Sequence, residues 1–265
     1  MTDNLKDRVE RIKKKSKVKG VLIEAVPNTP PETSPISNEI ARTPLFSPIK
    51  KGERKIHDMT KLPSPNGIDL YYFGKALDMG DQDVYLTALM LAKGVKPDDK
   101  IAINRTEFLK KMGRSKSGQA FKWLKSSFDR ISTGRLFYDT QDESGSTPLL
   151  GMLRYDKSLE TYYFTIPYES LKVFGYDSFG YVDMQKRFSI ENKVDLSKWL
   201  QSYAVSHKKG IHRVSVANLK EWSGYASKDW DFRIYLAEAL DELVRVGIFD
   251  RWCFTDENNK VEWFR

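Results

Sequence analysis

Two stretches of the chain follow one pattern: Ile101-Ala-Ile-Asn-Arg-Thr-Glu-Phe-Leu-Lys-Lys-Met-Gly113 and His212-Arg-Val-Ser-Val-Ala-Asn-Leu-Lys-Glu-Trp-Ser-Gly224. They lie 111 residues apart, and aligning them pairs Ile103 with Val214 and Phe108 with Leu219. Few positions are identical, but self-similarity at a fixed spacing is typical of repeated structural units. The sequence therefore predicts an internal duplication.

The same order of elements is predicted around both stretches. An apolar helical segment is followed by a strand, a short helix that ends at a glycine, a longer helix and an aromatic-rich hairpin. The bounds expected for strand, short helix and long helix are 100–103, 104–112 and 116–132 in the first copy and 211–214, 215–223 and 227–246 in the second. A helix-turn-helix followed by a hairpin is the order of the winged helix.

The hairpins differ in predicted size. The first is expected to contain three strands, Leu136–Gln141, Leu149–Tyr155 and Thr161–Ile166, with turns at 142–146 and 156–160. The second is expected to be compact, with strands at Ile248–Phe254 and Val261–Phe264 around a turn at 256–259. Clusters of Asp, Ser, Gly and Asn favour turns at these places.

We therefore predict an α+β, mainly helical fold: two tandem winged-helix domains after a disordered basic N-terminal tail. A basic run extends from Arg11 to Lys19, and the Pro-rich stretch 27–48 has the composition of a linker. The domains expected are a tail at 1–40, a first winged helix at 41–175 and a second at 176–265.

Composition narrows the class of protein. The 44 Lys and Arg residues outnumber the 36 Asp and Glu residues, which gives a formal charge of +8 and favours a polyanionic partner. The single cysteine, Cys253, excludes an intramolecular disulfide and a multi-cysteine zinc site. The N-terminus lacks the apolar core of a signal peptide, and no apolar run is long enough to span a membrane. We expect a cytoplasmic protein.

The long helix of the first copy has the composition of a DNA-recognition helix. It contains no acidic residue from Arg114 to Phe128, whereas the solvated face of an ordinary helix mixes both signs. Its exposed face, with the hairpin after it, would offer DNA the side chains of Arg114, Ser115, Lys116, Ser117, Gln119, Lys122, Ser126, Arg130 and Arg135.

The long helix of the second copy gives a mixed signal. Lys228, Trp230 and Arg233 near its start are candidate DNA contacts. Its C-terminal part carries several acids, which favours a solvated or protein-facing surface there. The choice between DNA and protein stays open for this helix.

Enzyme signatures fail. Gly113-Arg-Ser-Lys-Ser-Gly118 has the glycine spacing of a phosphate-binding loop, but Gln119 and Ala120 follow where that loop requires Lys and Ser or Thr. The three histidines show no metal-ligand spacing with carboxylates. We expect no catalytic residues, no metal and no cofactor.

Five ordered blocks resemble the TrfA-type plasmid replication initiators and cover the chain from about Ala41 to Phe254. They are Ala41-Arg-Thr-Pro-Leu-Phe46, Asp81-Gln-Asp-Val-Tyr-Leu86, Phe108-Leu-Lys-Lys-Met-Gly-Arg-Ser115 with Ser117-Gly118, Lys198-Trp-Leu-Gln-Ser-Tyr203 with Ser206-His207, and Ala237-Glu-Ala-Leu-Asp-Glu-Leu-Val244 with Gly247.

The resemblance implies a non-enzymatic initiator with two winged-helix domains. Such proteins bind repeated sites, called iterons, in plasmid origins, open nearby duplex and bring in host proteins such as DnaA, the replicative helicase and the sliding clamp. Their monomers are typically the active form, and their dimers are inactive. Carried onto this chain, the recognition helices are 116–132 and 227–246, and the protein is bacterial and plasmid-associated.

Two other functions remain open from the sequence. A winged-helix transcriptional regulator would also bind duplex DNA, but without direct repeats beside its gene. A protein-interaction module built on winged helices is favoured by the acids of the second long helix. A DNA-binding assay separates this module from both other functions.

Overall fold

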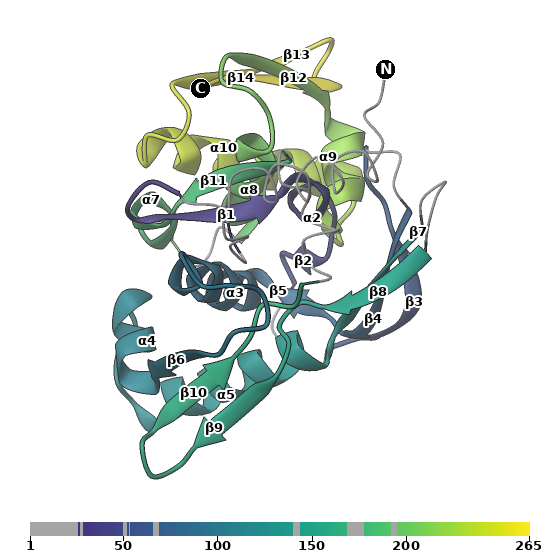
Figure 1. The fold of residues 1–265 in the computed structure, drawn as a ribbon. Helices are drawn as coiled ribbons and strands as arrows, with labels where there is room; N and C mark the ends of the chain where they lie inside the picture. The colour runs from purple at the N-terminus through teal and green to yellow at the C-terminus, as the bar shows by residue number, and fades with distance from the viewer. Residues whose placement is uncertain are drawn as a thin grey trace, which may run out of the picture.

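The computed structural model describes residues 26, 29–49, 52, 54–65, 69–139, 144–168, 178–191 and 195–265. Figure 1 shows two halves stacked around a middle layer that contains α3 and the β1–β11 pair. Residues 1–25 of the tail predicted at 1–40 lie outside the described residues, and so does the predicted boundary at 175/176. Among the described residues, no helix has the length and apolar character needed to cross a membrane.

The first half contains the elements expected from the repeat. They are α3 (Met79–Leu91), β6 (Ile101–Asn104), α4 (Arg105–Lys111), α5 (Gly118–Thr133), β9 (Leu153–Asp156) and β10 (Thr161–Phe164). The strands form a sheet of order β6-β10-β9. Phe108, Leu124 and Phe128 are fully buried between the helices and this sheet, because apolar residues recur at helical spacing on one face of α5.

The second half repeats this order. Its elements are α8 (Asp195–Val205), β12 (Ile211–Ser215), α9 (Val216–Ser223), α10 (Asp229–Arg245), β13 (Arg251–Thr255) and β14 (Lys260–Phe264), with sheet order β12-β14-β13. One hydrogen bond recurs in both halves. The Arg105 amide donates to the Glu160 carbonyl, and the Val216 amide donates to the Asn259 carbonyl, each at 2.9 Å. The duplication predicted from the sequence is therefore present in the backbone.

Glycines end helices for two different reasons. Gly113 and Gly224 both have φ +66, the left-handed conformation that was predicted at the ends of the two short helices. Gly134 after α5 has φ −73, and a Cβ there would lie 2.4 Å from the Tyr72 hydroxyl. Glycine is needed at position 134 because of close packing.

The predicted three-stranded first hairpin is wrong. A separate four-stranded sheet of order β3-β4-β7-β8 contains the first of the three strands. Leu136 and Tyr138 of β7 pair with Tyr72 and Leu70 of β4, which buries all four side chains. Residues 144–146 extend β8 where a turn was expected, and 142–143 lie outside the described residues. The strands of this sheet are β3 (Ile56–Leu62), β4 (Asp69–Lys75), β7 (Arg135–Asp139) and β8 (Ser144–Pro148).

The N-terminal segment is folded where a linker was expected. The segment contains β1 (Thr33–Ser37), α2 (Asn38–Ala41) and β2 (Phe46–Ser47). It contacts β5 (Leu77–Asp78), β11 (Phe179–Asp183) and α7 (Met184–Phe188). β1 pairs with β11 and β2 with β5. Ile36, Ile40 and Phe46 are buried, so this Pro-rich segment supplies enough apolar surface to pack. The expectation of a disordered stretch up to residue 40 is thus wrong for residues 33–40.

Candidate nucleic-acid interface

The start of α5 is built by a helix cap and a stacked arginine. The Ser117 hydroxyl accepts a hydrogen bond from the Ala120 amide at 3.1 Å, which satisfies one of the free amides of the first turn. The Arg114 guanidinium lies over the Trp123 ring, 3.8 Å from its centroid. These contacts join the turn between α4 and α5 to the first turns of α5.

Most of the predicted contacts lie together on this end of the helix. Six side chains are exposed there: Ser115, Lys116, Ser117, Gln119, Lys122 and Ser126. The positive end of the helix dipole adds to their charge, so the surface suits phosphate oxygens. The first acid of α5 is Asp129, which pairs with Lys125 at 2.6 Å. The exposed residues of the acid-free stretch therefore form a basic and polar surface.

A cleft of about 590 Å³ adjoins this surface. Arg114, Ser115, Ser117 and Gln119 line one side. Arg54 and Lys198 line it as well, but their charges are engaged, because Arg54 pairs with Asp78 and Asp81 and Lys198 pairs with Asp83. Arg114 is the one lining cation, among the described residues, for which no carboxylate partner is seen.

Arg130 does not belong to this surface, although the sequence placed it on the exposed face. Its side chain is 13% exposed and donates to both carboxylate oxygens of Asp81, at 2.7 and 3.1 Å. The Ser127 hydroxyl donates to the same carboxylate at 2.6 Å. Arg130 therefore anchors α5 to α3, and its charge is neutralised inside the first half.

Arg135 lies at the far end of α5, in β7. Its side chain is exposed and donates to the Ser146 hydroxyl at 3.1 Å. A helix of this length places the residue roughly 25 Å from the Ser117 cap. The structure does not bring Arg135 together with the basic surface.

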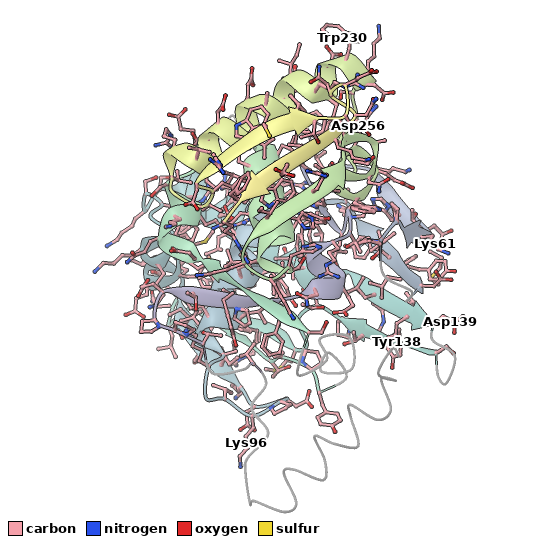
Figure 2. All side chains as sticks on the ribbon, turned by 90° about the horizontal axis from the view of Figure 1, so that it is seen from above. Lys61, Lys96, Tyr138, Asp139, Trp230 and Asp256 are labelled. Atoms are coloured by element: carbon pink, nitrogen blue, oxygen red, sulfur yellow. The ribbon has the colours of Figure 1, made fainter. Side chains whose placement is uncertain are left out.

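The candidates of the second half lie at one tip of the molecule. Trp230 is 60% exposed, and Figure 2 shows it at the outer end of the molecule, near Asp256. Arg233 donates to the Asn258 carbonyl at 3.3 Å and to the Asn259 side chain at 3.4 Å. Lys228 is exposed at the N-cap position of α10. The hairpin turn and the start of α10 thus form one surface.

Burial aligns the two long helices and shows how their outer faces differ. Leu124, Phe128 and Ile131 occupy the places of Leu236, Leu240 and Leu243, all fully buried. On the outer face, the aligned pairs are Gln119 with Asp231, Lys122 with Ile234 and Ser126 with Glu238. The second face is acidic and apolar where the first is basic and polar.

The turn of the first hairpin carries an exposed apolar side chain that the sequence prediction did not select. Leu159, 59% exposed, lies in the turn that joins β9 to β10. The Asp156 carboxylate accepts from the Ser158 hydroxyl and from the Leu159 amide, which lowers the pKa of Asp156 and fixes the turn. Arg154 and Lys100 lie over the Tyr163 ring at 4.6 and 5.5 Å.

Comparisons with known proteins identify the fold as that of initiator proteins. No family model matches the chain, and no curated protein matches it in sequence. The Pi initiator protein, solved in complex with iteron DNA, matches with a TM-score of 0.58 and 13% identity over 89% of this chain and 98% of that chain.

Domains 2 and 3 of RctB match in two crystal structures. Their TM-scores are 0.56 and 0.51 at 12% and 14% identity, over 86% of this chain and 98% and 95% of theirs. At such identities the likeness establishes the fold alone. The resemblance to replication initiators inferred from the sequence is thereby confirmed at the level of the fold.

Proposed function

We propose that this protein is a plasmid replication initiator that binds directly repeated sites in duplex DNA. The two halves act as tandem winged-helix units, with α5 and α10 as recognition helices. The observation that carries the proposal is the exposed basic surface at the start of α5. The initiator fold, which the Pi protein shows on iteron DNA, supports it.

Two recognition helices on one chain would read successive major-groove faces about one helical turn apart. Linking them raises the effective concentration of the second contact once the first is made. Several bound copies on a row of repeats would bend the DNA, and the stored deformation energy favours melting nearby. No nucleotide hydrolysis by this protein is required.

In this proposal the bound protein recruits host DnaA, the replicative helicase and the sliding clamp. It acts in the bacterial cytoplasm, and a monomer–dimer equilibrium controls copy number. The first half is the stronger DNA reader, because its outer helix face is basic along its first turns. Lys228, Trp230 and Arg233 give the second half a smaller DNA-binding surface at the start of α10.

The deciding experiment is footprinting of the full-length protein on the DNA that flanks its gene. Protection of direct repeats is the expected result. Lys122→Glu should abolish it, whereas Lys96→Glu should not. Lys96 is a matched control: it is exposed in the loop before β6, at the end of the sheet opposite the 156–160 turn. Absence of any protected repeat with the unsubstituted protein would overturn the proposal.

A second candidate function is protein docking by the second half. The outer face of α10 carries Ile234, 50% exposed, and Tyr235, 41% exposed, beside the exposed Glu238. An apolar surface bordered by acids suits a basic protein partner better than DNA. Retained footprints with Ile234→Glu, together with lost origin activity in cells, would favour this role for the second half.

A further inference from the structure

Two buried carboxylates on α3 connect to opposite halves of the molecule. Asp81 and Asp83 are 0% and 1% exposed. Asp81 binds Arg130 and Ser127 of α5. Asp83 accepts from the Arg187 guanidinium of α7 at 2.6 Å and from the Lys198 ammonium of α8 at 2.7 Å. Residues two apart on an α-helix point roughly 200° apart, so the two carboxylates face opposite sides of α3.

The cluster around Asp83 is closely hydrogen-bonded. Arg187 is 0% exposed and also donates to the side chain of Gln82 at 2.6 Å and to the carbonyl of Lys198 at 3.0 Å. Burial alone would raise the pKa of Asp83, but Arg187 and Lys198 outweigh it and hold that pKa below its usual range. Asp83 is therefore ionised and bound to two cations, Arg187 of α7 and Lys198 of the second half.

α3 thus links the two candidate recognition helices through directional contacts. On one side, Asp81 holds α5. On the other, Asp83 holds α7 and α8, and α8 in turn contacts α10 through the Ser197 hydroxyl, which donates to the Ala239 carbonyl at 3.2 Å. Apolar packing is non-directional and tolerates sliding, whereas hydrogen-bonded ion pairs require a narrow range of distances and angles. Asp83 therefore carries the ion-pair contact from the first half to α7 and α8.

We propose that Asp83, with Arg187 and Lys198, is a positioning site that sets the spacing between the two DNA half-sites which the protein accepts. This inference rests on the proposed function. Asp83 does not touch DNA in this scheme. It acts by keeping α5 and α10 at a fixed separation and angle, so that both helices meet the major groove only on correctly spaced sites.

The test compares Asp83→Asn with Asp81→Asn as a matched control, since both remove one buried charge from the same helix. Full-length protein is assayed on duplexes selected by the unsubstituted protein from a random library, with the two half-sites defined by footprinting. Spacers are then lengthened in single base pairs up to about half a helical turn, roughly five base pairs. Affinity is measured for each duplex by fluorescence anisotropy.

The unsubstituted protein should lose affinity on the order of 100-fold on misphased sites, because the second contact is lost. In Asp83→Asn the loss of affinity on misphased sites should be less than about tenfold, because a looser contact of α3 with α7 and α8 lets α5 and α10 both bind at several spacer lengths. Asp81→Asn should weaken binding to every duplex but keep the unsubstituted profile, because the buried Leu124 and Phe128 still fix α5 within the first half. An Asp83→Asn profile as sharp as that of the unsubstituted protein would overturn the inference.

A measurement without DNA separates failure of this inference from failure of the proposed function. Spin labels at Lys122→Cys and Glu238→Cys, in a Cys253→Ser background, report the distance between α5 and α10. Asp83→Asn should broaden the distribution, and an unchanged distribution overturns the inference whether or not the protein binds DNA. If Asp83→Asn does not fold, Lys198→Met removes one of the two ion pairs of Asp83, and the same broadening is expected.

Discussion

The guanidinium of Arg114 stacks on the indole ring of Trp123, with its central carbon 3.8 Å from the ring centroid. The stack holds a cation beside the Ser117 cap, so the arginine is ordered before any ligand arrives. A preordered side chain loses less entropy on binding. Trp123 packs against the core and also holds Arg114 beside the basic surface.

Removing either partner of this stack should weaken DNA binding, and the two effects should overlap. We expect Arg114→Ala and Trp123→Leu each to lower duplex affinity, with a coupling of about 0.5–2 kcal/mol in the double variant. Fluorescence anisotropy on one selected duplex gives all four affinities. Strictly additive losses would show that the stack does not prepare Arg114 for DNA.

Lys122 should contact a phosphate. Lys122→Ala is then expected to lower affinity on all sequences and to reduce the slope of log K against log salt by about one unit. The measurement is a salt titration between 50 and 200 mM, roughly the range over which such slopes are resolved. The same titration on Lys96→Ala should reproduce the unsubstituted slope. An unchanged slope in Lys122→Ala would remove this residue from the interface.

Arg130 should matter for stability rather than for DNA contact. Arg130→Leu leaves the buried Asp81 with Arg54 as its remaining cationic partner. We expect a loss of about 2–4 kcal/mol in the free energy of unfolding, since removal of one member of a buried pair is costly. Arg135→Leu, at an exposed site, should change it by less than about 0.5 kcal/mol. Urea unfolding distinguishes the two, and equal losses would contradict this assignment.

The folded state should lose stability in mild acid. Burial, followed by the positive charge of Arg42, lowers the pKa of His207 to about 4, and His212 and Arg265 act in the same direction. The unfolded chain binds a proton near the ordinary histidine pKa of about 6.5, so stability falls as pH drops from about 6.5 towards 4. Allowing for partial exposure, the loss at pH 5 is on the order of 1 kcal/mol.

Urea midpoints at pH 7.5 and 5 check this expectation. In His207→Gln the difference between the two midpoints should shrink, although His212, whose pKa is also lowered, keeps part of it. A midpoint that rises on acidification would contradict the sign of the effect.

The local sequence pattern was sufficient to predict the repeated elements. The bounds of α5 and α10 fall within two residues of those expected, because buried residues at helical spacing and the glycines after α4 and α9 mark them. The candidate surface at the start of α5 also followed from sequence, since the absence of acids is visible there. Local features of this kind need no knowledge of distant partners.

Contacts between distant segments could not be predicted in the same way. β7 was read as part of a hairpin because its alternation fits any sheet, and its partner β4 is separated from it by α3, α4 and α5. Arg130 looked exposed because the acid that binds it lies 49 residues away. The Asp83–Arg187 pair spans 104 residues. Without tertiary information, such charges cannot be told from solvated ones.

The pairing of β1 with β11 makes the first half an insertion between two strands of one sheet. Ile36 of β1 and Val182 of β11 are both fully buried there. A fragment from residue 176 onward would therefore lack a strand that it needs, and a fragment of residues 41–175 would lack the surface against which α3 packs. We expect neither fragment to fold alone, and we expect the two halves of the intact protein to unfold in a single calorimetric transition. Mixing a fragment of residues 26–175 with a fragment of residues 176–265 should restore this transition.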